Sequence, residues 1–339
     1  MTKINVLGVD LAKRIFQLHG NDSTGRTVFT QKVTRGKLLK TVSEIDKCVI
    51  AMEACSGANY WANEFSKLGH EVKLISPQFV KPFVKANKTD AADAEAIAEA
   101  ASRPNMRFVS IKQVWQQDIQ SIHRVRERLV KNKTALCNEM RGLLAEYGIA
   151  LSQGAYKLNK EVLFVLADAN NNLSDTIRGV IQDLYSELKG LESKVSEYNI
   201  RLENISANND TCTRIEKIPG IGTVTSTAIL SIIGTDVRNF KNGRQFAAYL
   251  GLVPRQSSSG GKINILGISK RGDTYIRTLL VHGARAAIRY AHLKDDRVSK
   301  WSTRKEKELG YNKAVVALAN KNARIIWALI ANETEYKVA

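Results

Sequence analysis

The chain has 339 residues, of which 44% are hydrophobic and 25% are charged, and its formal net charge at pH 7 is +18. This length is enough for two or three domains with their own cores, and so large a positive charge favours a polyanionic partner, nucleic acid first. The sequence shows no apolar run of about 18 residues and no signal peptide. Its four cysteines are scattered without a CxxC pair, which argues against a zinc site or a disulfide framework. We therefore expect a cytoplasmic protein that does not enter a membrane.

The first hundred residues alternate between short apolar runs and amphipathic segments. We predict strands over 4–11, 14–20, 27–33, 48–54 and 71–75, and helices over 36–45, 59–68 and 90–102. The first three strands are separated by short turns, so they should form an antiparallel meander. Three such strands followed by alternating helix and strand is the order of a ribonuclease-H-like fold.

This order places four acidic residues at one end of the predicted sheet. Asp10 and Glu53 close the first and fourth strands, and Asp90 and Asp93 stand three apart, on one face of a helix. Carboxylates this close repel one another unless a cation lies between them, and hard cations such as Mg²⁺ prefer carboxylate oxygens. Four converging carboxylates are what a two-metal phosphoryl-transfer centre requires.

Each acid also has a simpler explanation. The two helix acids suit the first turn of a helix or a solvent-facing position. Asp10 is compatible with a turn at the end of a strand, and Glu53 with an ion pair to Lys13 or Lys88. These explanations stay open for each acid singly, whereas a chance convergence of all four is a weaker explanation.

The middle of the chain has no proline between Pro104 and Pro219 and keeps apolar residues at alternating spacings of four and three. The residues of this seam are Ile177, Ile181, Leu184, Leu188, Leu191, Val195, Tyr198, Leu202 and Ile205. An earlier helix around 115–143 follows the same spacing, so we predict a helical coiled-coil region. The seam is compatible with pairing of two protomers and equally with a helical hairpin inside one chain.

Residues 218–222 read Ile-Pro-Gly-Ile-Gly and precede an apolar helical segment. In a helix-hairpin-helix turn, Gly220 and Gly222 would let backbone amides approach a phosphate at a helix N-terminus. A plain turn between two helices would have the same sequence, and only the surrounding positive charge favours DNA.

A basic segment with three adjacent serines, Ser257, Ser258 and Ser259, follows. From Gly251 to Gly310 there are thirteen Lys or Arg and five Asp or Glu. A serine hydroxyl needs a base or a metal before it becomes a good nucleophile, and this segment has no obvious base. A reactive serine here would depend on the acids of the first domain, whereas a flexible loop is the alternative.

Together these segments closely resemble the DEDD transposases of insertion-sequence families 110 and 1111. The matching segments are Gly8-Val-Asp10, Met52-Glu53-Ala54, Asn87-Lys-Thr-Asp-Ala-Ala-Asp93, Ile218-Pro-Gly-Ile-Gly222, Gly251-Leu-Val-Pro-Arg-Gln256, Ser258-Ser-Gly-Gly261 and Gly267-Ile-Ser-Lys-Arg-Gly-Asp273. They extend over nearly the whole chain, and the Gly-Gly after the serines is most similar to the second group.

The resemblance implies a RuvC-type, ribonuclease-H-like nuclease domain over 1–104, a helical coiled-coil region over 105–210 and a mainly helical transposase domain over 211–339. It implies that the four acids are Mg²⁺ ligands, namely Asp10, Glu53, Asp90 and Asp93. It also implies a serine that attacks a DNA phosphate and holds a covalent phosphoserine. Ser258 fits the pattern of the group best, and Ser259 is next.

Relatives of this kind are guided by a structured non-coding RNA that pairs with donor and target DNA. Their active sites are composite, with acids of one subunit meeting the serine of another, so the resemblance implies a homodimer or a homotetramer. We expect the protein in the bacterial cytoplasm, at the nucleoid when it is bound to DNA. The expected nucleic-acid contacts are Lys88, Arg255, Lys262, Lys270, Arg271 and Arg277, with Gly220 and Gly222.

The first hypothesis is therefore an Mg²⁺-dependent, RNA-guided DNA recombinase that moves its own element. The alternative is a Holliday-junction-type, structure-selective nuclease that uses water and the four acids, with the serine segment only binding DNA. A third hypothesis is a non-catalytic nucleic-acid-binding module in which the acids only support the fold.

Overall fold

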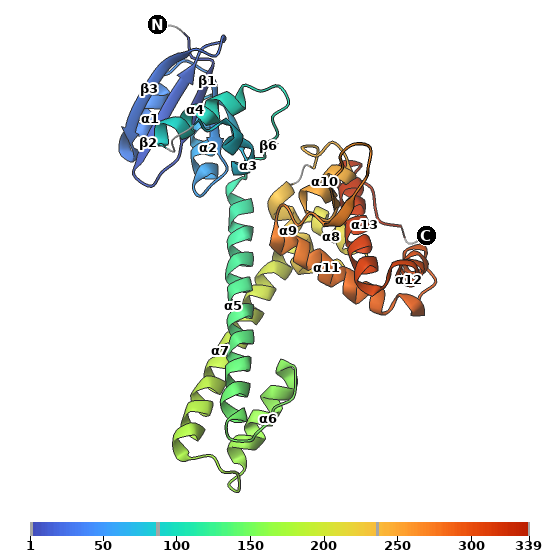
Figure 1. Cartoon of the computed structure of the whole chain (residues 1–339). Helices are drawn as coiled ribbons and strands as arrows, with labels where there is room; N and C mark the ends of the chain where they lie inside the picture. The colour runs from blue at the N-terminus through green and yellow to red at the C-terminus, as the bar shows by residue number, and fades with distance from the viewer. Residues whose placement is uncertain (1–2, 86–88, 235–236, 338–339) are drawn as a thin grey trace. The chain divides into compact units, whose positions relative to one another are not determined.

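The computed structural model describes residues 3–85, 89–234 and 237–337, and the chain divides into two compact units, Met1–Val114 and Trp115–Ala339. The first unit combines a sheet with helices, and the second is mostly helical (Figure 1). The first unit extends beyond residue 104 and includes the first ten residues of the region predicted over 105–210. The second unit contains the rest of that region and the whole region predicted over 211–339.

The first unit is built on a six-stranded mixed sheet with the order β3-β2-β1-β4-β5-β6. The strands are β1 (Val6–Asp10), β2 (Ile15–Asn21), β3 (Thr27–Thr34), β4 (Val49–Glu53), β5 (Glu71–Ile75) and β6 (Phe108–Val109). The first three form an antiparallel meander, whereas β4 runs parallel to β1, and β5 parallel to β4. This arrangement is consistent with the predicted ribonuclease-H-like fold. The short strand β6, which pairs with β5, was not predicted.

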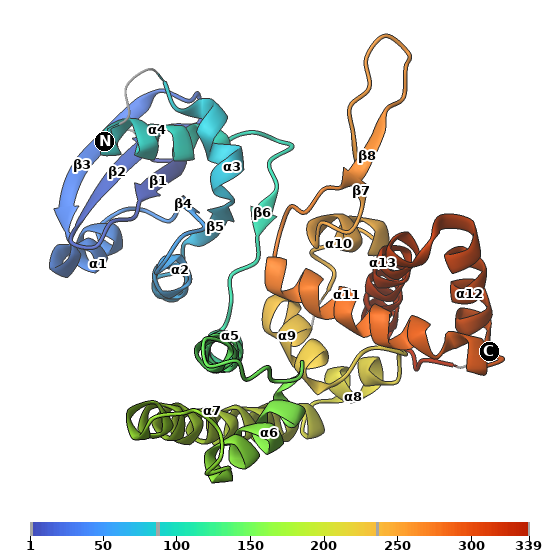
Figure 2. The ribbon, with the colours of Figure 1, turned by 60° about the horizontal axis from the view of Figure 1, so that its bottom comes forward.

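The two faces of the sheet carry different helices. On one face α1 (Arg35–Ser43) and α2 (Ala58–Lys67) share a core with Leu7 and Val9 of β1, and on the other α4 (Asp90–Ala101) packs over Val6. Successive side chains of a strand point to opposite faces. Residues 8 and 10 of β1 therefore face the side that α4 covers. Figure 2 shows α4 lying over the sheet.

Gly8 is the point where α4 approaches β1 most closely. A Cβ atom at this position would lie 2.3 Å from the backbone oxygen of Ala94 and 2.8 Å from the backbone nitrogen of Ala98. Both alanines are fully buried, so the contact side of the helix is also small. Because neither surface has a large side chain at the crossing, the helix backbone touches the strand and the start of α4 is held at one place.

Two short helices precede α4, and sequence patterning did not predict them. They are α3 (Pro77–Val80) and the 3₁₀ helix η1 (Lys81–Phe83). Pro77 and Pro82 each lie in the first turn of one of these helices. Proline is accepted there because the first helical N–H groups have no intrahelical acceptor.

The second unit begins with α5 (Val114–Ala145), α6 (Ala155–Ala167) and α7 (Asp175–Ala207). Met140 of α5, Leu158 of α6 and Ile181 of α7 are fully buried in one shared cluster. Further along, the guanidinium Nε of Arg126 in α5 donates to Asn199 Oδ1 in α7 at 2.6 Å. This part of the seam is therefore covered within the chain, as the intramolecular alternative requires.

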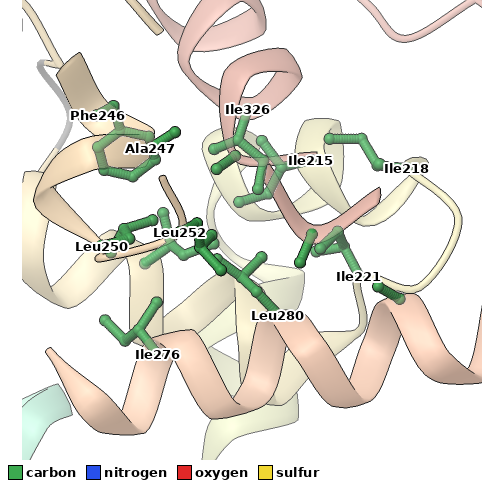
Figure 3. Close-up of a cluster of buried hydrophobic side chains, with 14 of the residues drawn as sticks. Ile215, Ile218, Ile221, Phe246, Ala247, Leu250, Leu252, Ile276, Leu280 and Ile326 are labelled. Atoms are coloured by element: carbon green, nitrogen blue, oxygen red, sulfur yellow. The ribbon is translucent and has the colours of Figure 1, made fainter. Parts of the chain in front are cut away.

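The remaining helices surround the largest hydrophobic core (Figure 3). They are α8 (Asp210–Glu216), α9 (Thr223–Ile233), α10 (Gly243–Tyr249), α11 (Thr274–Arg289), η2 (Ala291–Leu293), α12 (Arg297–Leu309) and α13 (Tyr311–Ala331). In the described chain α13 alone is long and apolar enough to cross a membrane by length and composition, which the sequence analysis did not single out. Half of its most apolar stretch is buried, so core packing accounts for its composition.

Gly220, in the turn between α8 and α9, packs directly against α11. A Cβ atom at Gly220 would lie 2.3 Å from the backbone oxygen of Gly283, and one at Gly283 would lie 1.8 Å from that of Gly220. Gly220 also has a φ of +85°, which glycine adopts most readily. Gly220 therefore has a packing role, and its contact with a phosphate stays a prediction. Gly222, the N-cap of α9, does have open space around it.

A buried histidine joins α5 to this C-terminal core. The Nδ1 atom of His123 lies 3.0 Å from the Tyr275 hydroxyl of α11, and its Nε2 atom lies 3.1 Å from Thr227 Oγ1 of α9. Burial, followed by the positive charge of Arg126, lowers the pKa of His123 from 6.5 to about 4. The imidazole is therefore neutral near pH 7 and connects three helices through two hydroxyl groups.

Replacing Gly8 with alanine tests the close crossing of α4 and β1. We expect Gly8→Ala to lower the free energy of unfolding by about 2–3 kcal/mol, because the added methyl group overlaps the α4 backbone. Urea unfolding of the full chain, with hydrogen exchange of the β1 amides, measures the loss. Gly36→Ala in α1 is the matched control, since nothing lies within 4 Å of a Cβ there. Equal stability of the two variants would contradict this account of the crossing.

Candidate active site

Asp10 and Glu53 are the last residues of two neighbouring parallel strands. The register pairs Val9 of β1 with Met52 of β4, so the two acids that follow lie side by side at the carboxyl ends of the strands. Ala51 lies in the cluster beneath α4, and by alternation Glu53 points to the same face as Asp10. Both carboxylates are half-buried.

The other two acids come from the first turn of α4. Thr89 caps this helix, with its Oγ1 accepting from the backbone N–H of Ala92 at 3.2 Å. Asp90 is exposed and Asp93 is half-buried. Because α4 touches β1 at Gly8, two residues before Asp10, its first turn is brought toward the acidic end of the sheet.

The pKa of Asp10 depends on how close the other three acids lie to it. Its pKa is raised from 3.8 to about 6, first by burial and then by the negative charges of Asp93, Asp90 and Glu53, in that order. The backbone N–H of Leu11, which bonds to the carboxylate, opposes this effect. All three other acids are thus near enough to Asp10 to disfavour its ionisation.

The acids gather at one end of the sheet without forming a closed cage. No three His, Cys, Asp or Glu side chains in the described part of the chain stand together closely enough to hold a metal ion as placed. Nor does an ion pair to Asp10, Asp90 or Asp93 occur among the described residues. The donors are all carboxylate oxygens, which match a hard divalent cation. Lys88, expected nearby, lies outside the described residues.

The three serines lie in a β-hairpin of the second unit (Figure 2). Its strands are β7 (Pro254–Gln256) and β8 (Ile265–Ile268). At its tip Ser259 pairs with Lys262 across Gly260 and Gly261, which have φ values of +56° and +76°. Two adjacent positive φ values make a type I′ turn, for which Gly-Gly is well suited. The segment is therefore a hairpin rather than an unstructured loop, and all three serines are exposed.

Ser258 is the serine whose hydroxyl has a defined neighbour. The side-chain amide of Gln256 donates to Ser258 Oγ at 2.8 Å, so the serine oxygen accepts and its own proton stays available. Gln256 was not singled out from the sequence, although its position two residues before Ser258 on an extended strand is the signal for it. Residues 254–268 contain no Asp, Glu or His, so the hairpin supplies no general base of its own.

The base of the hairpin is held by two glycines and a buried arginine. A Cβ atom at Gly251 would lie 2.1 Å from the backbone oxygen of Arg271, and one at Gly272 would lie 1.8 Å from that of Tyr249. The guanidinium of Arg277 donates to the backbone oxygens of Leu250 and Arg271, each at 3.2 Å. The two chain segments that enter and leave the hairpin are thereby joined.

Arg277 therefore differs from its predicted role as a phosphate contact. Its side chain is buried and already bonded to backbone oxygens and to the hydroxyl of Thr274. The four other cations predicted around the hairpin are all exposed, which leaves them accessible to nucleic acid. They are Arg255, Lys262, Lys270 and Arg271.

Comparison with known proteins relates both units to the same group. One family model, of the DEDD transposases of the IS110 type, matches residues 7–149, and that of the transposase IS116/IS110/IS902 family matches residues 212–299. The transposase for insertion sequence element IS1111A of Coxiella burnetii is 46% identical, covering 99% of this chain and 92% of that protein. A probable family 20 transposase of Pseudomonas aeruginosa is 46% identical over 98% of each chain. The transposase for insertion sequence element IS1328 of Yersinia enterocolitica is 37% identical over 99% of each.

The burial of Asp10, together with the acids crowded around it, predicts a pH-dependent effect of Asp10→Asn. Between about pH 4 and pH 6 the unfolded chain loses the Asp10 proton while the folded chain keeps it, so this group makes the fold less stable as pH rises. Asparagine cannot ionise. In a chelator-containing buffer we expect Asp10→Asn to melt about 2–4 °C above the unsubstituted protein at pH 8 and at the same temperature near pH 4.

Melting curves recorded by circular dichroism from pH 4 to pH 8 measure this difference. Glu44→Gln, which removes an exposed acid just after α1, is the matched control and should show no such rise. A difference between Asp10→Asn and the unsubstituted protein that is independent of pH would rule out crowding of the carboxylates as its cause.

Proposed function

Because this chain belongs to the IS110 family of DEDD transposases, we propose that it cuts and rejoins DNA at the ends of its insertion sequence by Mg²⁺-dependent phosphoryl transfer with a serine nucleophile. As a transposase the protein acts on DNA. The observation that carries the finer proposal is the crowding of three carboxylates around Asp10. A fold that places like charges together in this way is suited to binding a cation there.

We assign Mg²⁺ to the four acids, Asp10, Glu53, Asp90 and Asp93. Their oxygens are the ligands that this ion prefers. Burial comes first among the causes that raise the pKa of Asp10, and the negative charges of the three other acids add to it. When bound, the metal would neutralise the carboxylates and polarise the non-bridging oxygens of a phosphodiester. The contribution of the chain itself is to hold two acids on rigid strand ends and two on a helix that is packed against one of those strands.

The serine step that we propose conserves the number of phosphodiester bonds. The hydroxyl oxygen of Ser258 attacks the phosphorus, a bond from phosphorus to a sugar oxygen breaks, and a phosphoserine diester forms. The serine proton leaves, and the departing sugar oxygen takes up a proton, so the products are the covalent adduct and a free hydroxyl end. Attack by that kind of hydroxyl on the adduct reverses the step and releases the serine. Gln256, which donates to Ser258 Oγ, is suited to orient the hydroxyl.

A guide RNA and self-association complete the proposal. The net charge of +18 exceeds what solubility needs and is compatible with binding both DNA and a structured non-coding RNA. The hairpin that carries the serines has no acid or histidine, so activation of the serine must come from elsewhere. We propose a homodimer or homotetramer in which the acids and the serine come from different subunits, working in the bacterial cytoplasm on nucleoid DNA.

A Holliday-junction-type nuclease is the second candidate. The observation that favours it is that all four acids belong to one compact unit, which would suffice for attack by water. In that case the hairpin would bind DNA without forming a bond to it. The two candidates differ in whether protein becomes covalently attached to DNA.

Serine substitution separates the two candidates. On a plasmid that carries the element with its own flanks, we expect the Ser258→Ala, Ser259→Ala double variant to lose excision on the order of 10³-fold or more, together with all protein-linked DNA. Asp10→Ala should also abolish both. Quantitative PCR of the excised junction and denaturing electrophoresis of labelled DNA measure the two outcomes.

Ser257→Ala is the matched comparison, since it removes a neighbouring exposed hydroxyl from the same hairpin. It should keep both excision and the adduct. If the double serine variant still nicks DNA and no adduct forms with the unsubstituted protein, the nuclease is the correct function and the serine mechanism is not.

Guidance by RNA predicts a specific copurifying molecule. When the protein is produced from its complete element, sequencing of the bound RNA should give one structured transcript from the element. That transcript should contain segments complementary to donor and target DNA. Changing one of these segments should redirect insertion to the newly complementary site. Copurifying RNA without enrichment of the element's sequence would contradict guidance.

A further inference from the structure

A large cavity lies beside the base of the serine hairpin, within the second unit. Its volume is about 1500 Å³, and its walls come from α10, α12, α13 and the strand β8. On the hairpin side it is lined by Pro254 and by Ile265–Ile268. Pockets for small molecules usually measure about 300–1000 Å³, so this one has room for an extended chain segment rather than a single metabolite.

Among the described residues, the charged side chains that line the cavity are all positive. Among its lining residues in the described chain are four cations, Arg244, Lys313, Lys321 and Arg324, and no Asp or Glu. Lys321 is half-buried, and its pKa is lowered first by burial and then by Arg297, Arg324 and Arg304. These cations repel one another, so an anion in the cavity would relieve an existing repulsion.

The walls are also aromatic and apolar. Trp301 and Trp327 line the cavity, and the Nζ atom of Lys321 lies 4.2 Å from the centroid of the Trp301 ring. The indole N–H of Trp327 donates to the backbone oxygen of Phe240, which holds that ring in place. Ile265 and Leu266 of β8 also line the cavity and are 67% and 40% exposed. Adjacent exposed apolar side chains of this kind often mark an interaction surface.

We propose that this cavity binds an unpaired, single-stranded segment of nucleic acid, with bases against Trp301 and the apolar side chains and phosphates against Lys321 and Arg324. Alternating flat apolar faces and negative charges is the chemistry of a single strand, and stacking on aromatic rings with cations along the backbone is how such strands are held. A duplex hides its base faces and would contact only the cations. The assignment rests on the proposed function insofar as the neighbouring hairpin acts on DNA.

The site would keep an unpaired strand at the base of the hairpin that carries Ser258. Strand exchange requires that bases leave one pairing partner before they join another, and a strand in this interval needs a place to bind. Unpaired DNA and unpaired RNA share this chemistry, so the two sources must be separated by experiment.

Binding is tested on the full chain with Ser258→Ala and Ser259→Ala, so that the result does not depend on cleavage. Fluorescein-labelled strands of about 12 nucleotides, as single-stranded DNA, single-stranded RNA and duplex DNA of one sequence, are followed by anisotropy. Two changes remove the site, Trp301→Leu and the pair Lys321→Gln with Arg324→Gln. The control pair Lys300→Gln with Lys307→Gln removes two exposed charges of α12 that do not line the cavity.

We expect Trp301→Leu to weaken single-strand binding at least about fivefold and duplex binding by less than twofold. The Lys321, Arg324 pair should reduce the slope of log affinity against log salt concentration by about 1.4, because two phosphate contacts are lost. A strand that carries 5-iodouracil should crosslink to the peptide containing Trp301. Tighter binding of DNA or of RNA identifies the source.

Equal effects of the cavity and control pairs, or an equal loss of duplex and single-strand binding in Trp301→Leu, would overturn the proposal. Melting curves of each variant show whether the fold is retained, and the crosslink in the parent protein gives a result that needs no substitution in the cavity. If the serine mechanism is wrong, the crosslink and the salt slope are unaffected. If the cavity proposal is wrong, covalent adduct formation by the unsubstituted protein is unaffected.

Discussion

The contact between the backbone of α4 and β1 at Gly8 is the constraint on which the acidic site depends. Asp10 and Glu53 would lie side by side in any sheet with this register, because they end adjacent parallel strands. Asp90 and Asp93 join them only because α4 lies flat against β1, with a hypothetical Cβ of Gly8 only 2.3 Å from the Ala94 oxygen. A side chain there would push the helix outward and move the first turn of α4 away from Asp10.

The second unit also depends on close backbone contacts at glycines, which here hold the base of the serine hairpin. Gly251 and Gly272 let the two chain segments at the base of the serine hairpin touch, and Arg277 bonds to a backbone oxygen on each. The tip, with its Gly-Gly turn, contacts water and leaves Ser258 exposed. A rigid base with an accessible tip suits the nucleophilic role that we propose for Ser258, because its substrate would be as large as DNA.

The two units contain clusters of opposite charge, and each cluster is repulsive by itself. In the first unit burial and then three carboxylates raise the pKa of Asp10, and in the second unit burial and then three arginines lower the pKa of Lys321. Both arrangements disfavour the free protein, and a ligand of the opposite sign would relieve each of them. The ligands that we propose are a divalent cation at the acids and phosphates in the cavity.

Local patterns in the sequence determined the elements of the first unit, because alternation and helical periodicity depend only on neighbouring residues. They also determined the residue types of the candidate site: four acids at element ends and three serines beside two glycines. The short elements α3, η1 and β6 were not predicted from the sequence, because so few residues carry too little periodic signal. Periodicity likewise could not identify the partner of the seam in α7, whose residues between 177 and 191 pack with α5 and α6 of the same chain.

Tertiary structure alone decided what the glycines and the arginine do. The turn sequence around Gly220 did not indicate that this residue packs against Gly283, far along the chain. Likewise, Arg277 was predicted as a surface cation, whereas its guanidinium is buried and bonds to backbone oxygens. Sequence patterns were enough to identify the chemical groups of this protein, such as its four acids and three serines, and the elements of the first unit that hold the acids. Which of them face a ligand and which face the protein depended on long-range packing, because burial is a property of the neighbours that folding brings together and not of the residue.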